Sequence, residues 1–191
     1  MIENTEKLLS RLGEQLELID SPKISLVICG GSALNVTGIV KRTTKDIDVL
    51  GQLRHKKVVK EQLPESFWAA AKTVGEEFDL EEGWINDDPS PMVKGGLPEG
   101  LEERLIKKNY GTKLTVGYIG RLDQIYFKLW ASADRNPDSY HVQDLKKLEP
   151  SPEEIEGAAR WCMKQDPSEG FRQILVNMLQ ELGFEDVSGK L

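Results

Sequence analysis

A run of six mostly apolar residues that leads straight into two glycines constrains the fold of this chain most strongly. Residues 24–29 read Ile-Ser-Leu-Val-Ile-Cys and are followed at once by Gly30, Gly31 and Ser32. A short, nearly continuous apolar run is typical of a central strand that is buried on both faces. Because glycine tolerates the conformations of a sharp turn, the segment predicts a strand, a turn and then a short helix.

A pair of aspartates follows on the next predicted strand, which reads Asp-Ile-Asp-Val-Leu. Residues two apart on a strand project from the same face, so Asp46 and Asp48 lie together while Ile47 and Val49 face a core. Neighbouring carboxylates repel each other unless a cation lies between them, and Mg²⁺ takes such oxygen ligands together with substrate phosphates. The glycine turn upstream can present backbone N–H groups to those phosphates, so the two motifs together suggest nucleotide chemistry.

Each motif alone has a simpler explanation. A strand–helix junction often needs glycine for its backbone conformation, and an Asp-x-Asp pair on a strand is often a solvated face. Their joint placement, after a buried strand and separated by one short helix, favours the functional interpretation.

The composition excludes some classes of function. The 191 residues carry a formal net charge of −7, with 39% hydrophobic and 30% charged residues. This acidic balance argues against extended DNA binding, but it permits a single nucleotide or a short RNA end. No apolar run has the length of a membrane span, the N-terminus lacks a signal-peptide core, and Cys29 and Cys162 have no metal-type spacing. We therefore expect a cytoplasmic protein that does not associate with membranes.

Most of the remaining chain has helical periodicity. Apolar residues recur at helical spacing over residues 5–19 and 121–135, and another helix is expected to begin near Pro64. Ser151 and Asp166 are each followed directly by proline and, three positions on, by glutamate. This pattern predicts two C-terminal helices that begin after Ser151 and Asp166.

The predicted elements define a fold class. Residues 114–119 alternate like a third strand, whereas residues 83–96 are rich in glycine and proline and predict a long loop. We expect an α/β (α+β) fold in which a small mixed sheet is flanked by helices. One domain is expected over residues 1–150, with a helical C-terminal extension packed on it over residues 151–191.

The order of strand, Gly-Gly-Ser turn, short helix, loop and Asp-x-Asp strand resembles the signature of the nucleotidyltransferase superfamily typified by DNA polymerase beta. Within it, Gly-Gly-Ser-Ala-Leu at 30–34 and Arg-Thr-Thr-Lys-Asp-Ile-Asp-Val at 42–49 are similar to a minimal prokaryotic group. That group includes AbiEii-type toxins and uncharacterised relatives. A weaker similarity covers residues 121–148.

The resemblance implies roles for the two central motifs. Asp46 and Asp48 would bind Mg²⁺, or Mn²⁺ in its place, and act in catalysis. Gly30, Gly31 and Ser32 would bind the triphosphate of the nucleotide. The fold implied is that of a nucleotidyltransferase.

Basic residues near these motifs have two interpretations. Arg121, Lys128 and Arg135 lie seven residues apart, and so line one flank of the predicted helix over 121–135. The resemblance gives Lys128 a part in neutralising the triphosphate, whereas Arg121 and Arg135 more simply border a buried stripe. Arg42 and Lys45 flank the aspartate pair and either neutralise phosphate charge or balance the two aspartates.

A further aspartate in the weaker match is a catalytic candidate. Asp144 resembles an aspartate to which AbiEii-like enzymes give a catalytic role. A structural alternative is that Asp144 pairs with Lys147 or Arg135. The sequence leaves both interpretations open.

One part of the superfamily pattern is missing. Metal-dependent members generally use a third carboxylate, on a later strand, to activate the attacking hydroxyl. The strand at 113–119 contains no acid, and Asp79, Asp87 and Asp88 do not match the position well.

Two functions are therefore predicted. The first is Mg²⁺-dependent transfer of an NMP group from an NTP to a hydroxyl of tRNA, a protein or a small molecule. The alternative is a non-catalytic NTP-binding or toxin–antitoxin-type partner module.

Overall fold

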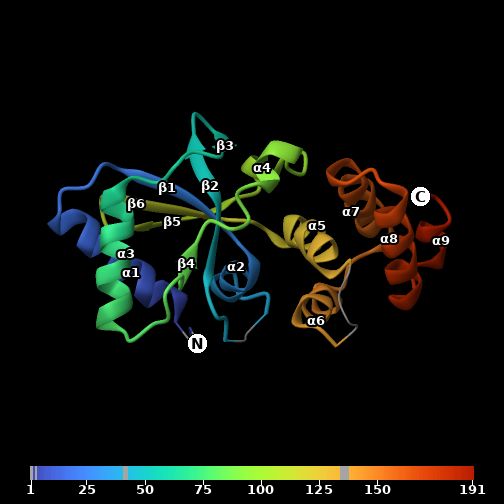
Figure 1. Ribbon diagram of the computed structural model, residues 1–191, viewed down its shortest axis with the longest axis horizontal. Helices are drawn as coiled ribbons and strands as arrows, with labels where there is room; N and C mark the ends of the chain where they lie inside the picture. The colour runs from blue at the N-terminus through green and yellow to red at the C-terminus, as the bar shows by residue number, and fades with distance from the viewer. Residues whose placement is uncertain (1, 3, 41–42, 134–137) are drawn as a thin grey trace. The chain divides into compact units, whose positions relative to one another are not determined.

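The structure is a computed structural model that describes residues 2, 4–40, 43–133 and 138–191. The chain divides into two compact units, Met1–Gly120 and Arg121–Leu191, and each is described by itself. The first contains a mixed sheet with its helices, and the second is helical (Figure 1). The expected division into a domain over residues 1–150 and a helical extension over residues 151–191 stays a prediction.

The described part of the first unit forms a six-stranded sheet in the order β3-β2-β1-β6-β5, with β4 also paired to β2. β1 is antiparallel to β2 and parallel to β6, β4 is parallel to β2, and β5 is antiparallel to β6. The strands are β1 (Ile24–Cys29), β2 (Ile47–Arg54), β3 (Lys57–Val59), β4 (Ile85–Asn86), β5 (Ile106–Tyr110) and β6 (Leu114–Tyr118). The expected mixed α/β fold with flanking helices is thus confirmed.

The first predicted strand is central and covered on both faces. Leu26 and Ile28 of β1 belong to one hydrophobic core, and Val27, which points to the opposite face, is also completely buried. Full burial of each such side chain stabilises the fold by about 1.5–3 kcal/mol. This gain explains why the run forms a strand in the interior of the protein.

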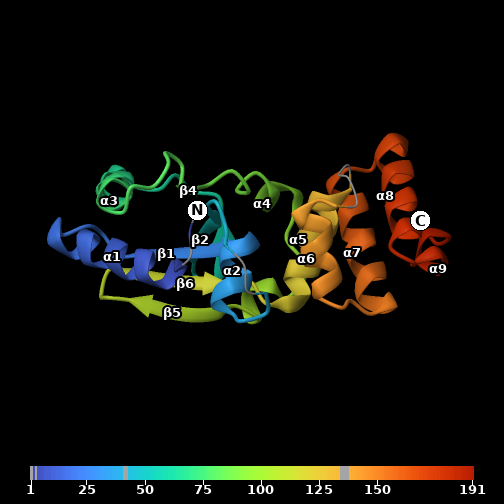
Figure 2. The ribbon, with the colours of Figure 1, turned by 90° about the horizontal axis from the view of Figure 1, so that it is seen from below.

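Amphipathic helices complete that core. The apolar faces of α1 (Thr5–Leu18) and α3 (Glu65–Glu77) join the sheet residues in one cluster. Figure 2 shows α1 lying along the sheet. A Cβ atom at Gly13 of α1 would collide with the backbone of Tyr110, so glycine permits the close approach of this helix to β5. The shorter helical segments are α2 (Gly30–Val36), α4 (Met92–Gly95) and η1 (Leu101–Glu103).

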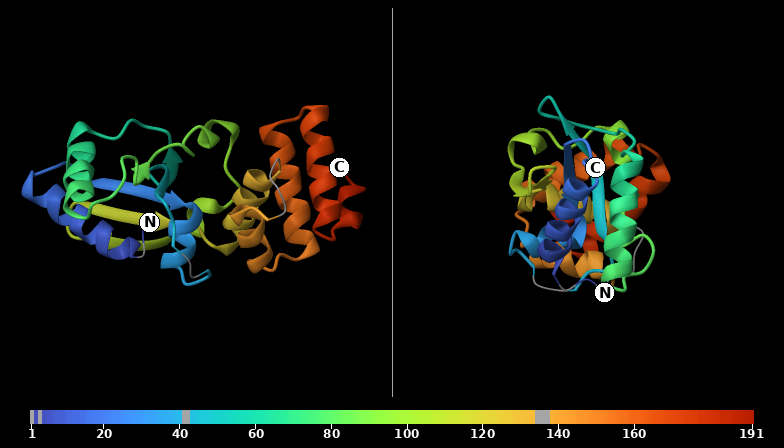
Figure 3. Two further views of the ribbon diagram at one scale, coloured as in Figure 1. Left: turned by 60° about the horizontal axis from the view of Figure 1, so that its bottom comes forward. Right: turned by 90° about the vertical axis from the view of Figure 1, so that its left-hand side faces the viewer.

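In the second unit, the helix that begins at Arg121 packs against the helices that begin at Tyr140 and Pro152, and the last two helices pack against each other and against the one that begins at Pro152 (Figure 3). Its helices are α5 (Arg121–Ser132), α6 (Tyr140–Lys147), α7 (Pro152–Gln165), α8 (Glu169–Glu181) and α9 (Glu185–Ser188). Trp161 of α7 contacts the aromatic rings of Tyr126, Phe127 and Trp130 on α5. These aromatic contacts explain why α5 and α7 pack together.

One of the two predicted C-terminal helix starts is confirmed and the other is wrong. The Ser151 hydroxyl accepts a hydrogen bond from the Glu154 N–H and Glu154 bonds back to the Ser151 N–H, which is a complete capping box. The next helix begins at Glu169 after the cap Ser168, not directly after Asp166. Asp166 instead accepts from the Ser168 N–H in the turn that precedes the helix.

The structure also corrects the expectation of a long loop over residues 83–96. This stretch contains β4 and the short helix α4. β4 is only two residues long and depends on pairing with β2, so local composition does not reveal it. The strands β3 and β5 are also absent from the sequence prediction. Among the residues described, no helix is both long and apolar enough to cross a membrane.

Candidate functional site

The glycine motif lies where β1 passes into α2. Gly30 has a φ of +70°, in the left-handed region, and is already the first residue of α2. The glycines therefore form the first turn of the helix and not a separate turn before it. The Ser32 hydroxyl is fully buried and donates to the carbonyl of Cys29 at 3.3 Å. The side chain of Ser32 thus stabilises the junction.

The aspartate motif lies where the chain enters β2: Asp46 directly precedes Ile47, the first residue of the strand, and Asp48 is its second residue. Ile47 and Val49 are buried in the hydrophobic core, whereas Asp46 and Asp48 are partly exposed. The alternation predicted from the sequence is therefore confirmed for the apolar residues. Asp48 is paired with Cys29 of β1, the residue directly before the glycine motif.

The two motifs meet at Gly30 and Asp48. A Cβ atom at residue 30 would collide with the Oδ2 atom of Asp48. The backbone of the glycine turn and a carboxylate of the aspartate pair are therefore close neighbours. This arrangement fits a hard divalent cation, because such an ion binds carboxylate oxygens and phosphate oxygens at the same time.

A third polar side chain, which the sequence did not indicate, lies beside Asp48. Asn86 of β4 is the register partner of Asp48, and Ile85 is the partner of Ile47. The Ile47 N–H donates to the carbonyl of Trp84 at 2.7 Å, which fixes the two strands at this point. Partners in a sheet share a face, so Asn86 and Asp48 project to the same side.

The acids considered as a third carboxylate do not take that position. Asp87 and Asp88 are exposed and follow the end of β4, and Asp79 is exposed beyond α3 with a φ of +50°. Over the described ranges, no group of three or more His, Cys, Asp or Glu side chains is gathered as a metal cluster. The candidate site therefore offers two carboxylates and one amide.

A pocket of about 940 Å³ adjoins β4, between it, α3 and the intervening loop. Asn86 lines it, so the pocket reaches the strand that pairs with Asp48. Among its lining residues, five are acidic and one, Lys72, is basic, which disfavours a triphosphate in the pocket itself. The acidic residues are Glu76, Asp79, Glu81, Glu82 and Asp87.

The second unit contains Lys128 and Asp144, two further candidate residues from the sequence, and brings their side chains into contact. Lys128 of α5 donates from Nζ to Oδ2 of Asp144 on α6 at 2.8 Å, and their side chains are only 4% and 1% exposed. The Lys128 ammonium also lies 5.8 Å from the ring centre of Tyr140. Lys128 is thus a partner of Asp144. A buried pair of this kind binds α5 to α6.

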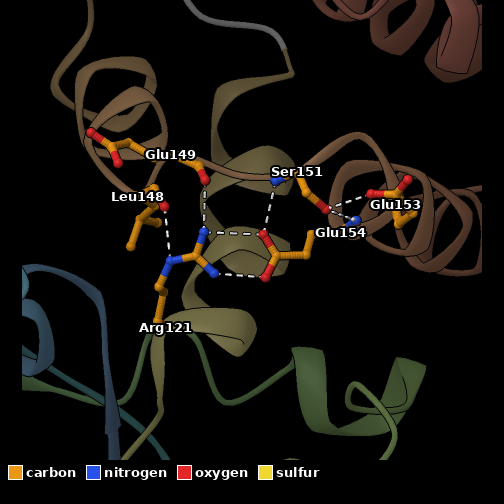
Figure 4. Close-up of polar contacts among 6 residues, drawn as sticks. All are labelled: Arg121, Leu148, Glu149, Ser151, Glu153 and Glu154. Atoms are coloured by element: carbon orange, nitrogen blue, oxygen red, sulfur yellow. Dashed lines mark hydrogen bonds and ion pairs between the residues drawn. The ribbon is translucent and has the colours of Figure 1, made fainter.

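Arg121 makes structural contacts at the start of α5 (Figure 4). Its guanidinium binds both carboxylate oxygens of Glu154, at 2.6 and 3.0 Å, and donates to the carbonyls of Leu148 and Glu149. The hydrogen bonds from Arg121 lower the pKa of the Glu154 carboxyl. Arg121 therefore joins the end of α6 to the start of α7. Arg42 and Arg135 lie outside the described residues.

Comparison with known protein families shows which family this chain belongs to. A sequence model described as a nucleotidyltransferase of unknown function (DUF6036) matches residues 7–148, which is more than half of the chain. The chain belongs to this nucleotidyltransferase family. No curated protein and no solved structure matches it significantly.

The region matched by the nucleotidyltransferase family contains the glycine turn, the aspartate pair, Lys128 and Asp144. It spans β1 to β6 and continues through α5 and α6. Asn86 also lies within it, although no local motif marks its position. The apolar pair Trp84-Ile85 before Asn86 is the local signal for a short buried strand, but strand pairing decides its register.

Proposed function

We propose that this nucleotidyltransferase transfers an NMP group from an NTP to a hydroxyl acceptor, with Mg²⁺ or Mn²⁺ bound by Asp46 and Asp48. The approach of Gly30 to the Asp48 carboxylate is the observation that supports this most directly. It means that a phosphate beside the glycine turn and a cation on the aspartates would be in reach of each other.

Each motif has a distinct part in the proposed reaction. The acceptor oxygen attacks the α-phosphorus, the bond to the β-phosphate oxygen breaks, and pyrophosphate leaves with its electron pair. A bound divalent cation would neutralise the charge that develops on the phosphate oxygens. Asp46 and Asp48 would hold that cation, and the backbone of Gly30, Gly31 and Ser32 would bind the triphosphate.

The roles of Lys128 and Asp144 are part of the same proposal. The resemblance of this region assigns Lys128 to the triphosphate and Asp144 to catalysis. Their buried ion pair supports a second explanation, in which they hold α5 and α6 together. The variants described in the Discussion separate the two roles.

Label transfer tests the proposed activity. The wild-type protein is incubated with Mg²⁺ and each of the four α-³²P-labelled NTPs, with tRNA, protein and small hydroxyl compounds as acceptors. Replacing Asp46→Asn and Asp48→Asn together should abolish transfer. The double variant Asp87→Asn/Asp88→Asn removes the same charge from exposed residues and should retain it. Transfer by the Asp46/Asp48 variant equal to the wild type would contradict the mechanism.

A non-catalytic NTP-binding or toxin–antitoxin-type module is the second candidate function. The observation that favours it is the amide of Asn86, where a third carboxylate beside Asp48 would be expected. Calorimetry that detects Mg·NTP binding, without pyrophosphate release in the presence of any acceptor, would support this alternative. We also propose that the protein belongs to the AbiEii-type group and acts in the cytoplasm.

A further inference from the structure

The position of Asn86 is set by the sheet. Pairing between β4 and β2 is parallel, with Asn86 opposite Asp48 and Ile85 opposite Ile47. Ile85 is 3% exposed and belongs to the core, so β4 cannot shift by one residue without exposing it. Asn86 is therefore held on the same face of the sheet as Asp48.

The orientation of the Asn86 amide is also constrained. Its Oδ1 atom accepts a hydrogen bond from the backbone N–H of Asp88 at 3.1 Å. The Nδ2 group, at the other end of the amide, donates to no side chain or backbone group in the part of the chain that the structure describes. Asn86 is partly buried and lines the pocket that adjoins β4. The side chain thus presents a hydrogen-bond donor next to the aspartate pair.

We infer that Asn86 is a positioning residue whose Nδ2–H group donates a hydrogen bond to an oxygen of the nucleotide bound beside Asp48. This inference rests on the proposed function, because it requires a nucleotide at the aspartate pair. An amide differs from a carboxylate in two ways here: it donates to oxygen, and it cannot accept a proton from the attacking hydroxyl. Asn86 therefore orients the nucleotide and does not act as a general base.

Two substitutions separate the donor from the other properties of Asn86. Asn86→Asp keeps an oxygen that can accept from the Asp88 N–H but removes the Nδ2 donor and adds a charge. Asn86→Ala removes both hydrogen bonds and adds no charge. Asn109→Asp is the matched control, because Asn109 also lies on a strand, β5, and its Oδ1 also accepts a hydrogen bond, from the Thr115 hydroxyl.

Binding of the α,β-methylene analogues of ATP, GTP, CTP and UTP is measured by calorimetry at a Mg²⁺ concentration that saturates the cation site in every variant, so that a change in cation affinity does not alter the nucleotide affinity. Loss of one hydrogen bond to the nucleotide should weaken the best analogue by about tenfold in both Asn86 variants. Asn109→Asp should bind as the wild type does. Thermal melting of each variant shows that the fold is retained.

The outcomes distinguish three explanations. Wild-type affinity in Asn86→Asp would show that only the turn with Asp88 matters, and would overturn the inference. A loss in Asn86→Asp but not in Asn86→Ala would assign the effect to charge, and would overturn it as well. Weaker binding in both variants supports the donor.

A second readout does not need a nucleotide. Mn²⁺ binding to the protein alone is followed by electron paramagnetic resonance. If Asn86 lies beside the cation site, Asn86→Asp supplies a third carboxylate and should tighten Mn²⁺ binding by about tenfold, whereas Asn109→Asp should not. Unchanged Mn²⁺ affinity would contradict the position inferred for Asn86. If the wild type binds Mn²⁺ but no nucleotide analogue, the proposed function fails, and the Mn²⁺ result still decides the position of Asn86.

Discussion

The Cα atom of Gly30 lies so close to the Asp48 carboxylate that no side chain can be added at residue 30 without displacing Oδ2 of Asp48. Gly30 also has a φ of +70°, which residues with a Cβ atom rarely adopt. Two separate requirements thus select glycine at the junction of β1 and α2. One belongs to the backbone and the other to the candidate metal site.

Gly30→Ala should therefore impair both folding and nucleotide binding. The left-handed conformation alone costs about 1–2 kcal/mol of unfolding free energy, and displacement of Asp48 should weaken Mg·NTP binding by about tenfold or more. Gly38→Ala is the control, because Gly38 has a φ of +74° but no atom within 4 Å of a Cβ built there. Urea unfolding and calorimetry measure the two effects. Equal nucleotide affinity in both variants would contradict the role assigned to this contact.

Replacing only one residue of the buried pair Lys128 and Asp144 should lower the free energy of unfolding strongly. Asp144→Leu takes this counter-ion from the buried Lys128 ammonium, and Lys128→Met takes this partner from the buried Asp144 carboxylate. Each single change should lower the free energy of unfolding by about 3–5 kcal/mol. The double variant removes both charges and should lose much less than the sum of the single losses. Urea denaturation of all four proteins measures this coupling.

The same double variant tests the proposed catalytic roles. If Lys128 and Asp144 act in transfer, a folded double variant should have lost label transfer. If they only hold α5 to α6, the folded double variant should transfer the label as the wild type does. Additive losses of stability would instead show that the ion pair is not a coupled unit.

The pair of Arg121 and Glu154 should make stability depend on pH in the acid range. Hydrogen bonds from Arg121 lower the pKa of Glu154 below its usual range. A carboxyl with a lowered pKa in the folded state stabilises the protein above its unfolded pKa, and this contribution is lost as the pH falls through the folded value. Glu154→Gln should therefore reduce the free energy of unfolding at pH 7 by about 1 kcal/mol, since both side chains are partly exposed.

The difference between wild type and Glu154→Gln should shrink toward pH 3. Urea unfolding at several pH values measures it. Glu103→Gln, at an exposed position on η1, should leave the curve unchanged. A difference that is independent of pH would show that Glu154 acts through the capping box alone and not through its charge.

Two tyrosines in the sheet should resist ionisation. The hydroxyls of Tyr110 and Tyr118 lie 2.6 Å apart in the core, and burial raises the pKa of both. In an absorbance titration at alkaline pH, Tyr110 and Tyr118 should therefore ionise only as the protein unfolds. Because a raised pKa favours the neutral form, stability should fall as the pH rises above the value of an unfolded tyrosine.

Tyr118→Phe provides the check on that assignment. It removes one late-titrating group and leaves the Tyr110 hydroxyl without this partner, at a cost of about 1–3 kcal/mol. Four tyrosines that titrate together near pH 10 in the native protein would contradict the buried pair.

The strongest local patterns gave correct elements. The apolar run at β1 and the alternation at Ile47 and Val49 reflect burial, which the type of each residue largely determines. The capping box at Ser151 is also local, because its hydrogen bonds join residues three apart. The sequence misplaces the start of α8 because two polar residues on either side of Pro167, Asp166 and Ser168, can both cap a helix, and the backbone selects the second.

The sequence by itself determined the two motifs of the candidate site: two glycines directly after a buried strand, and an Asp-Ile-Asp segment that leads into the next strand. These features depend on backbone freedom and on the two-residue repeat of a strand. Only the tertiary structure decided that Gly30 lies against Asp48, that Asn86 is the neighbour of Asp48, and that Lys128 pairs with Asp144. Those relationships depend on strand register and helix packing between distant residues, which no local pattern encodes.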